Sequence, residues 1–191
     1  MKNSRFLFLF TLTYFALGFV NIHFALLGLV CMALPLILLL KNKKKTWCQG
    51  YCPRASLYTN CGKLKGKSSR KTPMFFINGH MKWIMLAYFA ISLFFIIGST
   101  LKVASGSMMP MNYLRFLLVI PIRGEMPQLI ELSGIAPWLT HFSYRFYSMM
   151  MTTTTLGLIL AFIYKPRTWC TVCPIATVSD IYIKSCKSKS L

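Results

Sequence analysis

The stretch KTWCQGYCP at residues 45–53 decides how this chain folds, because it returns almost unchanged as RTWCTVCP at residues 167–174. Each copy reads as a basic residue, Thr-Trp-Cys, two or three further residues, and Cys-Pro. Each copy also follows directly on a long apolar segment and a patch of positive charge. The repetition predicts two similar halves, each with its own cysteine motif.

The composition indicates a membrane protein. The chain has 191 residues, of which 55% are hydrophobic and 13% are charged, whereas about a quarter of the residues in a soluble domain are charged. The net charge of +19 would also suit a nucleic-acid binder. However, the basic residues cluster at the ends of apolar segments, where anionic lipid and membrane topology explain them. We therefore exclude nucleic acid and expect membrane lipid as a partner.

The apolar segments predict an all-α membrane protein with four transmembrane helices, arranged as two repeated hairpins. Residues 6–40 would be about 52 Å long as a single helix, too long for a hydrocarbon core of about 30 Å. The polar break at residues 21–23 therefore marks a tight turn, and the start of the chain is read as an uncleaved span rather than a signal peptide. The expected spans are about Phe6–Val20, Phe24–Leu40, Trp83–Leu101 and Ser143–Tyr164.

The connection at about residues 103–142 is expected to lie on the outer side. Tyr113–Ile122 is apolar but ends near Pro121, and it is too short to cross a membrane. Together with Met126–Leu139 it is expected to form interfacial or re-entrant pieces that cover the ends of the spans. The run Thr152–Thr155 is expected on a helix-packing face, because threonine can bond to its own helix or to a neighbour.

The charge distribution predicts the orientation of one integral membrane domain over residues 1–191, with repeat one at about 5–61 and repeat two at about 82–186. Two hairpins put both termini and both cysteine motifs on one side, with all but four of the 22 Lys and Arg. By the positive-inside rule this is the cytoplasmic side of the inner membrane. The four outer residues are Lys102, Arg115, Arg123 and Arg145.

The two motifs together predict a metal centre with four thiolate ligands, namely Cys48, Cys52, Cys170 and Cys173. Four thiolates suit a [4Fe–4S] cluster, a [2Fe–2S] cluster or a zinc ion. The proline after each second cysteine favours an extended cysteine and a helix start. Helices are therefore expected at residues 54–60 and 175–184, with N–H groups that point toward the sulfurs and lower the thiolate pKa.

The remaining cysteines and the histidines carry weaker signals. Cys61 and Cys186 follow the motifs in the same order in both halves, so they are further candidates for a second site, or else free thiols. Cys31 is expected as an apolar packing residue. His23 and His141, on the outer side, could serve a haem or a quinol, but interfacial hydrogen bonding is the expected role. Trp47 and Trp169 are expected as interfacial anchors that also shield the site.

Two alternatives to an iron–sulfur protein remain open. One is a zinc-stabilised membrane scaffold or assembly factor, although ferredoxin-type ligand runs, unlike most zinc motifs, end in Cys-Pro. The other is a membrane thiol–disulfide oxidoreductase, which needs thiols on the oxidising side, where the predicted outer loop has none. No acid–base pair or nucleophile constellation is visible, so no catalytic residue is expected.

The hairpin, Cys-x-x-x-Cys-Pro, hairpin, Cys-x-x-Cys-Pro order resembles the NapH- and NosR-type membrane 4Fe–4S binding proteins, which are polyferredoxin-like membrane subunits. The resemblance covers about residues 5–182 and implies an electron-transfer component of an oxidoreductase complex rather than a stand-alone enzyme. It implies a link from a cytoplasmic donor or the quinol pool to a partner redox protein, through a ferredoxin, a flavoprotein or a quinol-linked protein. This chain differs in its shorter second motif and in lacking the C-terminal ferredoxin tail.

Overall fold

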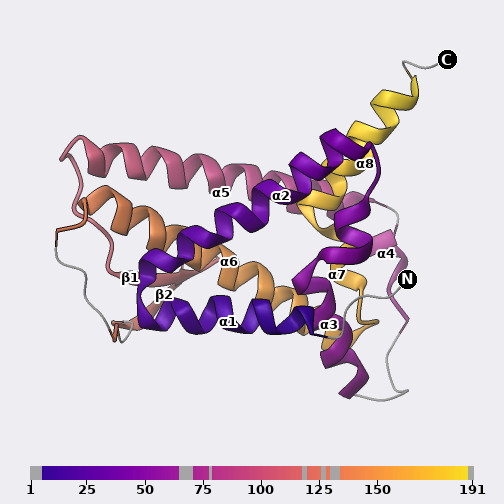
Figure 1. Ribbon diagram of the computed structural model, residues 1–191, viewed down its shortest axis with the longest axis horizontal. Coiled ribbons are helices and arrows are strands. Elements are labelled where there is room, and N and C mark those ends of the chain that lie inside the picture. Colours follow the sequence, from indigo (N-terminus) through magenta and orange to yellow (C-terminus); the bar gives the residue numbers. More distant parts are fainter. Residues whose placement is uncertain are drawn as a thin grey trace. The chain divides into compact units, whose positions relative to one another are not determined.

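The computed structural model describes residues 6–64, 71–77, 79–117, 120–125, 128–129 and 134–188. The chain is mostly helical, as predicted, and Figure 1 shows the elements in chain order. The helices are α1 Leu7–Val20, η1 Ile22–Leu26, α2 Leu27–Asn42, η2 Trp47–Tyr51, α3 Pro53–Leu64, α4 Met74–Ile77, α5 His80–Ala104, α6 Pro137–Ile163, α7 Thr168–Val172 and α8 Pro174–Ser188. The strands are β1 Tyr113–Phe116 and β2 Ile120–Glu125.

The chain forms two compact units that share its long helices. Unit 1 comprises Met1–Thr11, Cys31–Phe89 and Leu156–Leu191, and unit 2 comprises Leu12–Val30 and Ala90–Thr155. Both cysteine motifs fall in unit 1, whereas the predicted outer connection falls in unit 2. The cysteine chemistry and the outer connection are therefore packed separately.

Three described helical segments are long and apolar enough to cross a membrane, as expected for a membrane protein. They are Ile22–Asn42 with 21 residues, α5 with 25 residues and α6 with 27 residues. At 1.5 Å per residue, even the shortest is about 31 Å long, which matches a hydrocarbon core of about 30 Å. The apolar helix α1 has 14 residues and is about 21 Å long. Helix α6 begins at Pro137, six residues before the predicted span, because proline suits the first turn of a helix.

The predicted turn at residues 21–23 is present and has a local cause. The side chain of Asn21 accepts a hydrogen bond of 2.9 Å from the backbone N–H of His23 and caps the 3₁₀ helix η1. The Tyr14 hydroxyl of α1 then donates to the Ala25 carbonyl at 3.1 Å. A Cβ atom at Gly28 would overlap the Tyr14 ring and hydroxyl, so the glycine permits the close approach. These contacts close a helical hairpin within unit 2.

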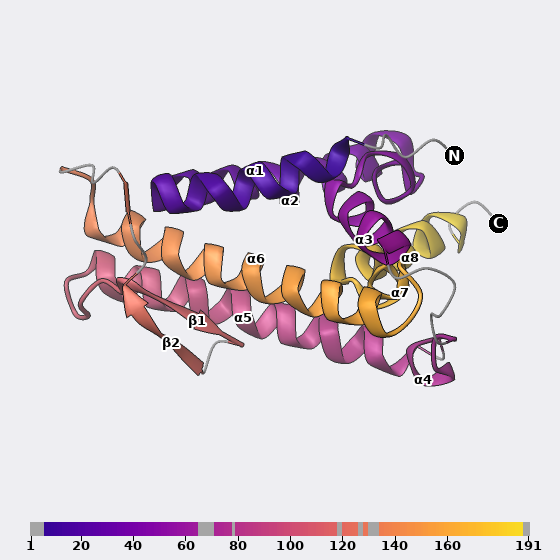
Figure 2. The same cartoon turned by 90° about the horizontal axis from the view of Figure 1, so that it is seen from below.

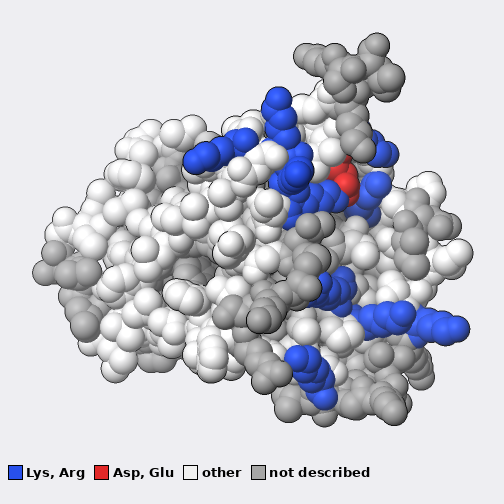
Figure 3. Space-filling model, turned by 45° about the vertical axis from the view of Figure 1, so that its right-hand side comes forward, with Lys and Arg blue, Asp and Glu red and all other residues white. Residues whose placement is uncertain are grey.

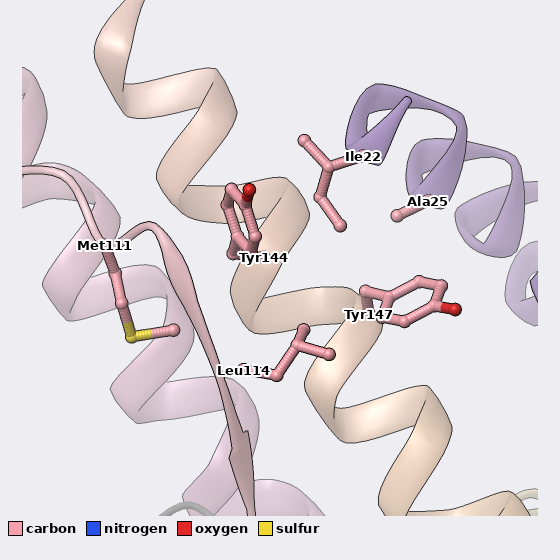
Figure 4. Close-up of a cluster of buried hydrophobic side chains, with 6 residues drawn as sticks. All are labelled: Ile22, Ala25, Met111, Leu114, Tyr144 and Tyr147. Atoms are coloured by element: carbon pink, nitrogen blue, oxygen red, sulfur yellow. The ribbon is translucent and has the colours of Figure 1, made fainter. Parts of the chain in front are cut away.

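The core of unit 2 is a cluster of apolar and aromatic side chains drawn from three parts of the chain. Figure 4 shows that it joins η1, the segment around β1 and helix α6. The Tyr147 hydroxyl also donates to the Phe15 carbonyl at 3.0 Å, and the two rings meet edge to face. The buried members are Ile22, Ala25, Met111, Leu114, Tyr144 and Tyr147.

A two-stranded antiparallel sheet corrects the prediction that the protein is all-α. Strand β1 pairs with β2 in the register Arg115 to Pro121 and Phe116 to Ile120. The segment is rich in Tyr, Phe and Ile, which favour strands, and Pro121 would interrupt a helix. The rest of the predicted piece at Met126–Leu139 lies partly outside the described residues, and its end forms the first turn of α6.

Polar side chains of α6 accept hydrogen bonds from backbone N–H groups of β1 and of the residues on either side of it. The backbone N–H groups of Met111, Arg115 and Leu117 donate to His141, Ser148 and Thr152 at 3.0, 3.1 and 3.3 Å. Such acceptors matter because a backbone N–H at membrane depth has no water to bond. Thr152 lies near the middle of α6, so the hairpin runs far along this helix (Figure 2). Thr152 and Thr153 also donate to carbonyl groups of their own helix and are buried, as predicted for a packing face, and Thr152 in addition contacts the β hairpin at Leu117.

Candidate metal centre

The first cysteine motif folds as one turn of π-helix. Residues Trp47–Tyr51 form this turn, and the N–H of Cys52 bonds to the carbonyl of Trp47 at 3.0 Å. A π turn takes one more residue per hydrogen bond than an α turn, and it is often found at functional sites. It brings Cys48 and Cys52, which have three residues between them, close to one turn apart.

The second motif reaches a similar arrangement through a turn of α-helix. Cys170 lies in α7, Thr168–Val172, and Cys173 is the residue that ends this helix. Two intervening residues fit the tighter α turn, as three fit the wider π turn. The different types of helical turn therefore compensate for the extra residue in the first motif. In each motif the two cysteines lie about one turn apart.

The predicted effect of the two prolines is confirmed. Cys52 has φ −70° and ψ 111°, and Cys173 has φ −60° and ψ 128°, so both cysteines are extended. Pro53 and Pro174 are the first residues of α3 and α8. The carbonyl groups of the two cysteines accept the first hydrogen bonds of these helices, from Ser56 at 3.3 Å and from Thr177 at 3.0 Å. Each motif thus ends at a helix N-terminus.

The N-terminus of α8 stabilises a thiolate at Cys173. The backbone N–H groups of Ile175 and Ala176 hydrogen-bond to its sulfur and lower its pKa, as does the charge of Arg54. Burial, the largest influence, nevertheless raises the pKa of this thiol above its ordinary value. The prediction that helix N–H groups point toward the sulfurs is therefore confirmed at this motif, but the predicted lowering of the thiol pKa is wrong, because burial outweighs these hydrogen bonds.

The four thiols lie close enough to influence one another's charge. Burial raises the pKa of Cys48 to about 11, and the neighbouring thiols Cys173 and Cys52 add to the increase. Burial also raises the pKa of Cys170 to about 12, with further contributions from Cys52, Cys173 and Cys48. With pKa values raised in this way, ionisation of Cys48 and Cys170 calls for positive charge close to their sulfur atoms.

The four thiols do not form a ready-made site for a single ion. Within the described parts of the chain, no group of three or more His, Cys, Asp or Glu residues is close enough to hold one metal ion. A tetrahedral zinc ion holds its sulfurs about 3.8 Å apart, as follows from Zn–S bonds of about 2.3 Å. A cluster of several iron atoms is larger and needs more widely spaced thiolates. All seven cysteines are free thiols, which leaves the four able to bind.

The other cysteines lie away from the starts of the helices. Cys61 is near the end of α3 and Cys186 near the end of α8, about 12 Å and 18 Å along the helix axes from Pro53 and Pro174. Cys186 hydrogen-bonds to the side chain of Tyr182, one turn earlier. Cys31 is part of α2. A second site at Cys61 and Cys186 stays a prediction.

A cluster of buried hydrophobic side chains lies beside the second motif. Trp169 is 4% exposed and packs with Tyr58, Ala161 and Val172, while Cys173 packs against the same cluster. Trp169 is therefore a core residue, whereas sequence analysis predicted an interfacial anchor. Trp47 in the first motif is half-buried. The sequence carried no separate signal for Tyr58, which lies six residues after Cys52 on α3.

Two contacts join the halves of the repeat. Lys45, just before the first motif, forms an ion pair with Asp180 of α8, which follows the second motif. A Cβ atom at Gly62 of α3 would overlap Pro166, just before the second motif, so glycine allows these segments to touch. In Figure 3 Lys and Arg side chains surround the acidic side chain in view. The exposed basic residues of unit 1 include Lys41, Lys43, Lys44, Lys63, Lys71, Lys165, Arg167 and Lys184.

The two histidines that were predicted on the outer side, His23 and His141, have structural roles. His23 bonds through its two ring nitrogens to Asn21 at 2.7 Å and Thr140 at 3.2 Å. His141 accepts from the Met111 N–H at Nδ1, and its Nε2 lies 3.0 Å from the Ser99 hydroxyl. Since all four ring nitrogens are engaged, the expected hydrogen-bonding role agrees with the geometry.

Two segments of the chain, residues 24–71 and 147–190, match a family model described as a 4Fe-4S binding domain. The first segment contains Cys48 and Cys52, and the second contains Cys170 and Cys173. No curated protein and no solved structure matches the chain. The double match is consistent with a 4Fe–4S binding protein and supports an iron–sulfur cluster as its cofactor.

Proposed function

We propose that this chain is an integral membrane protein that binds one [4Fe–4S] cluster through Cys48, Cys52, Cys170 and Cys173 and transfers single electrons. The observation that supports this proposal is that unit 1 contains both cysteine motifs and that each motif ends at the N-terminus of a helix, α3 or α8. A bound cluster would accept and release one electron at a time. The donor set fits, because four thiolates are the usual ligands of such a cluster.

The residues of the chain support this role by adjusting charge and excluding water. The N–H groups at the start of α8 favour the charged form of Cys173, and Lys45 and Arg167 do so for Cys48 and Cys170. The buried Trp169 and Tyr58 form an apolar wall beside Cys173. Burial and hydrogen bonds of this kind set the potential of an iron–sulfur centre.

We propose four transmembrane helices in two hairpins, with both motifs and both termini in the cytoplasm. Three helices of spanning length and the shorter helix α1 support this arrangement, as does the positive-inside charge pattern. A membrane-impermeant thiol reagent added from outside should therefore fail to label Cys48 and Cys170 in intact cells and label them after lysis in denaturant with an iron chelator, which removes a bound cluster. Labelling of either cysteine in intact cells would contradict this topology.

The partners would be redox proteins of a membrane complex, as in the NapH- and NosR-type proteins. The exposed Lys and Arg residues of unit 1 suit an acidic electron carrier such as a ferredoxin or a flavoprotein. The second redox partner would be quinol-linked or a further redox protein. This role makes the chain a component of an oxidoreductase complex.

Anaerobic purification with analysis of iron, sulfide and zinc, followed by EPR of the reduced protein, tests the proposal. We expect four iron and four sulfide per chain and the signal of a reduced cluster. Cys170→Ser should abolish the signal, and Cys31→Ser should leave it intact, because Cys31 lies in α2 outside the motifs. A protein that contains only zinc, or a Cys170→Ser variant with an unchanged cluster, would overturn the proposal or its ligand assignment.

A further inference from the structure

Tyr58 has a buried hydroxyl group that nothing in the described structure satisfies. The side chain is 1% exposed, and its hydroxyl oxygen is buried with no hydrogen-bond partner. Leaving such a group unpaired costs about 1–3 kcal/mol. Buried polar groups in native proteins nearly always have a partner, so this hydroxyl calls for one that the described residues do not provide.

The surroundings of Tyr58 point to the cysteine motifs. Tyr58 packs in the same cluster as Trp169 and Val172, and Cys173 lies against that cluster. Burial raises the pKa of Tyr58 most, and the charges of Cys173, Cys52 and Cys170 raise it further. The Tyr58 hydroxyl is therefore influenced electrostatically by three of the four candidate ligands.

The other side of the hydroxyl is closed by a residue without a side chain. A Cβ atom at Gly157 of α6 would overlap the Tyr58 hydroxyl. Glycine therefore makes room for the phenol there but offers it no side-chain acceptor. A cluster bound at the two motifs would bring further sulfur acceptors, its sulfides and ionised cysteine sulfurs, into this environment.

We infer that the Tyr58 hydroxyl donates a hydrogen bond to the bound cluster, either to a cysteine sulfur or to a bridging sulfide. This inference rests on the proposed function. A donor to the cluster sulfurs stabilises the reduced, more negative state and so raises the reduction potential. Tyr58 is thus a positioning residue that tunes the electron-transfer centre.

The test compares Tyr58→Phe with Tyr51→Phe in an EPR-monitored redox titration of the whole protein. Tyr51 lies within the first motif but is 63% exposed, so it is a matched control. Tyr58→Phe should keep its iron and disfavour reduction about tenfold, which is about 59 mV for one electron. Tyr51→Phe should leave the potential unchanged.

An intact cluster with unchanged potential in Tyr58→Phe would overturn the inference and leave the proposed function standing. A wild-type protein without a cluster would instead overturn the proposed function. If Tyr58→Phe loses its iron, 3-fluorotyrosine placed at position 58 keeps the shape and donates more strongly. It should raise the potential, and the absence of that rise would also overturn the inference.

An independent observation in unit 2 concerns two arginines. Arg145 of α6 is 9% exposed, and its Nε and the Nε of Arg115 in β1 are both buried without a hydrogen-bond partner among the described side chains. The guanidinium of Arg115 donates to the Tyr113 hydroxyl and lies 5.2 Å from the centre of the Tyr113 ring. The charges of the two arginines act on each other.

This arrangement of two arginines is unfavourable in free energy unless a negatively charged group binds to them. Guanidinium groups only donate hydrogen bonds, and two buried like charges repel. An arginine that merely reached for the membrane surface would be exposed at its tip, which Arg145 is not. The ion pair found among the described side chains involves neither arginine.

The geometry further points to an oxyanion site at Arg115 and Arg145, which would bind a phosphate group. The phosphate would come from an anionic lipid or from free inorganic phosphate, and both offer the acceptors that paired guanidinium groups recognise. His141 takes no part, since both of its ring nitrogens are already engaged. The Nε groups of the two arginines would be the donors.

Thermal unfolding of the full chain in neutral detergent tests this site. Phosphatidylglycerol, or inorganic phosphate in the second arm, should raise the wild-type Tm by a few degrees, and phosphatidylcholine should not. Arg145→Gln should lose the response, whereas Lys102→Gln should keep it, because Lys102 is an exposed outer cation on α5. No response to either phosphate source, or an equal response in Arg145→Gln, would overturn the site. A phosphate response that appears only in Glu125→Gln would also overturn the site, because it would show that a carboxylate of this chain fills it in the wild type.

Discussion

In unit 2 the backbone N–H groups beside β1 and both histidines form hydrogen bonds with residues of the same unit, such as Asn21 and Thr152. In unit 1 the corresponding polar groups are the thiols of the two motifs, none of which forms a disulfide. If the proposed function is right, the first unit is built around a group that it binds, and the second around bonds that it already makes. Removal of a bound group should accordingly affect one unit much more than the other.

Loss of the cluster is expected to have the largest effect. Treatment with an iron chelator under anaerobic conditions should speed hydrogen exchange in α7 and α8 by roughly 100-fold, because metal binding and local folding are coupled. The amides of Met111 and Arg115, which donate to His141 and Ser148, should exchange at their former rates. Equal acceleration in both units would contradict the division that the contacts indicate.

Gly157→Ala is expected to have the next largest effect, on unit 1. The new methyl group would overlap the Tyr58 ring and hydroxyl, and overpacking of this kind costs about 1–3 kcal/mol. Gly98→Ala in unit 2 is the matched control, because a Cβ atom there meets nothing within 4 Å. Denaturant unfolding should separate the two variants clearly, and similar stabilities would mean that Tyr58 does not pack closely against Gly157.

Thr152→Val tests the hydrogen bonds of unit 2. The Thr152 hydroxyl accepts from the N–H of Leu117 at 3.3 Å and donates to the Ser148 carbonyl at 2.9 Å. Valine has the same shape without an acceptor, so a part-buried N–H loses its partner at a cost of about 1 kcal/mol. Thr154→Val should be neutral or stabilising, because that hydroxyl is buried and has no partner among the described residues. Thermal unfolding of the two variants checks this, and a larger loss in Thr154→Val would refute it.

Local rules allowed much of unit 1 to be predicted from the sequence. Proline fixes the conformation of the residue before it and suits a helix start, so the extended Cys52 and Cys173 and the starts of α3 and α8 followed from Pro53 and Pro174. The turn at Asn21 followed from length and polarity in the same way. Each of these features depends on a few adjacent residues.

The features that the sequence did not reveal depend on distant contacts. The β1–β2 hairpin needs acceptors from α6, more than thirty residues away. The burial of Trp169 and Tyr58 needs three helices to meet. The π turn of the first motif could have been suspected from the extra residue between Cys48 and Cys52, but only the α turn in the second copy explains why both spacings work.

Asp180→Asn is expected to have the smallest effect on stability. The Lys45–Asp180 ion pair joins the two motif segments, but its side chains are 28% and 49% exposed, and exposed pairs contribute about 0–1 kcal/mol. The substitution should therefore lower Tm only slightly, and less at high salt, since salt screens the pair. Its effect on the centre should be easier to measure, because Asp180 raises the pKa of Cys48 and a negative charge beside a cluster disfavours reduction. We expect Asp180→Asn to raise the reduction potential, opposite in sign to Tyr58→Phe, and a lower potential would mean that loss of the Lys45 contact outweighs loss of the charge.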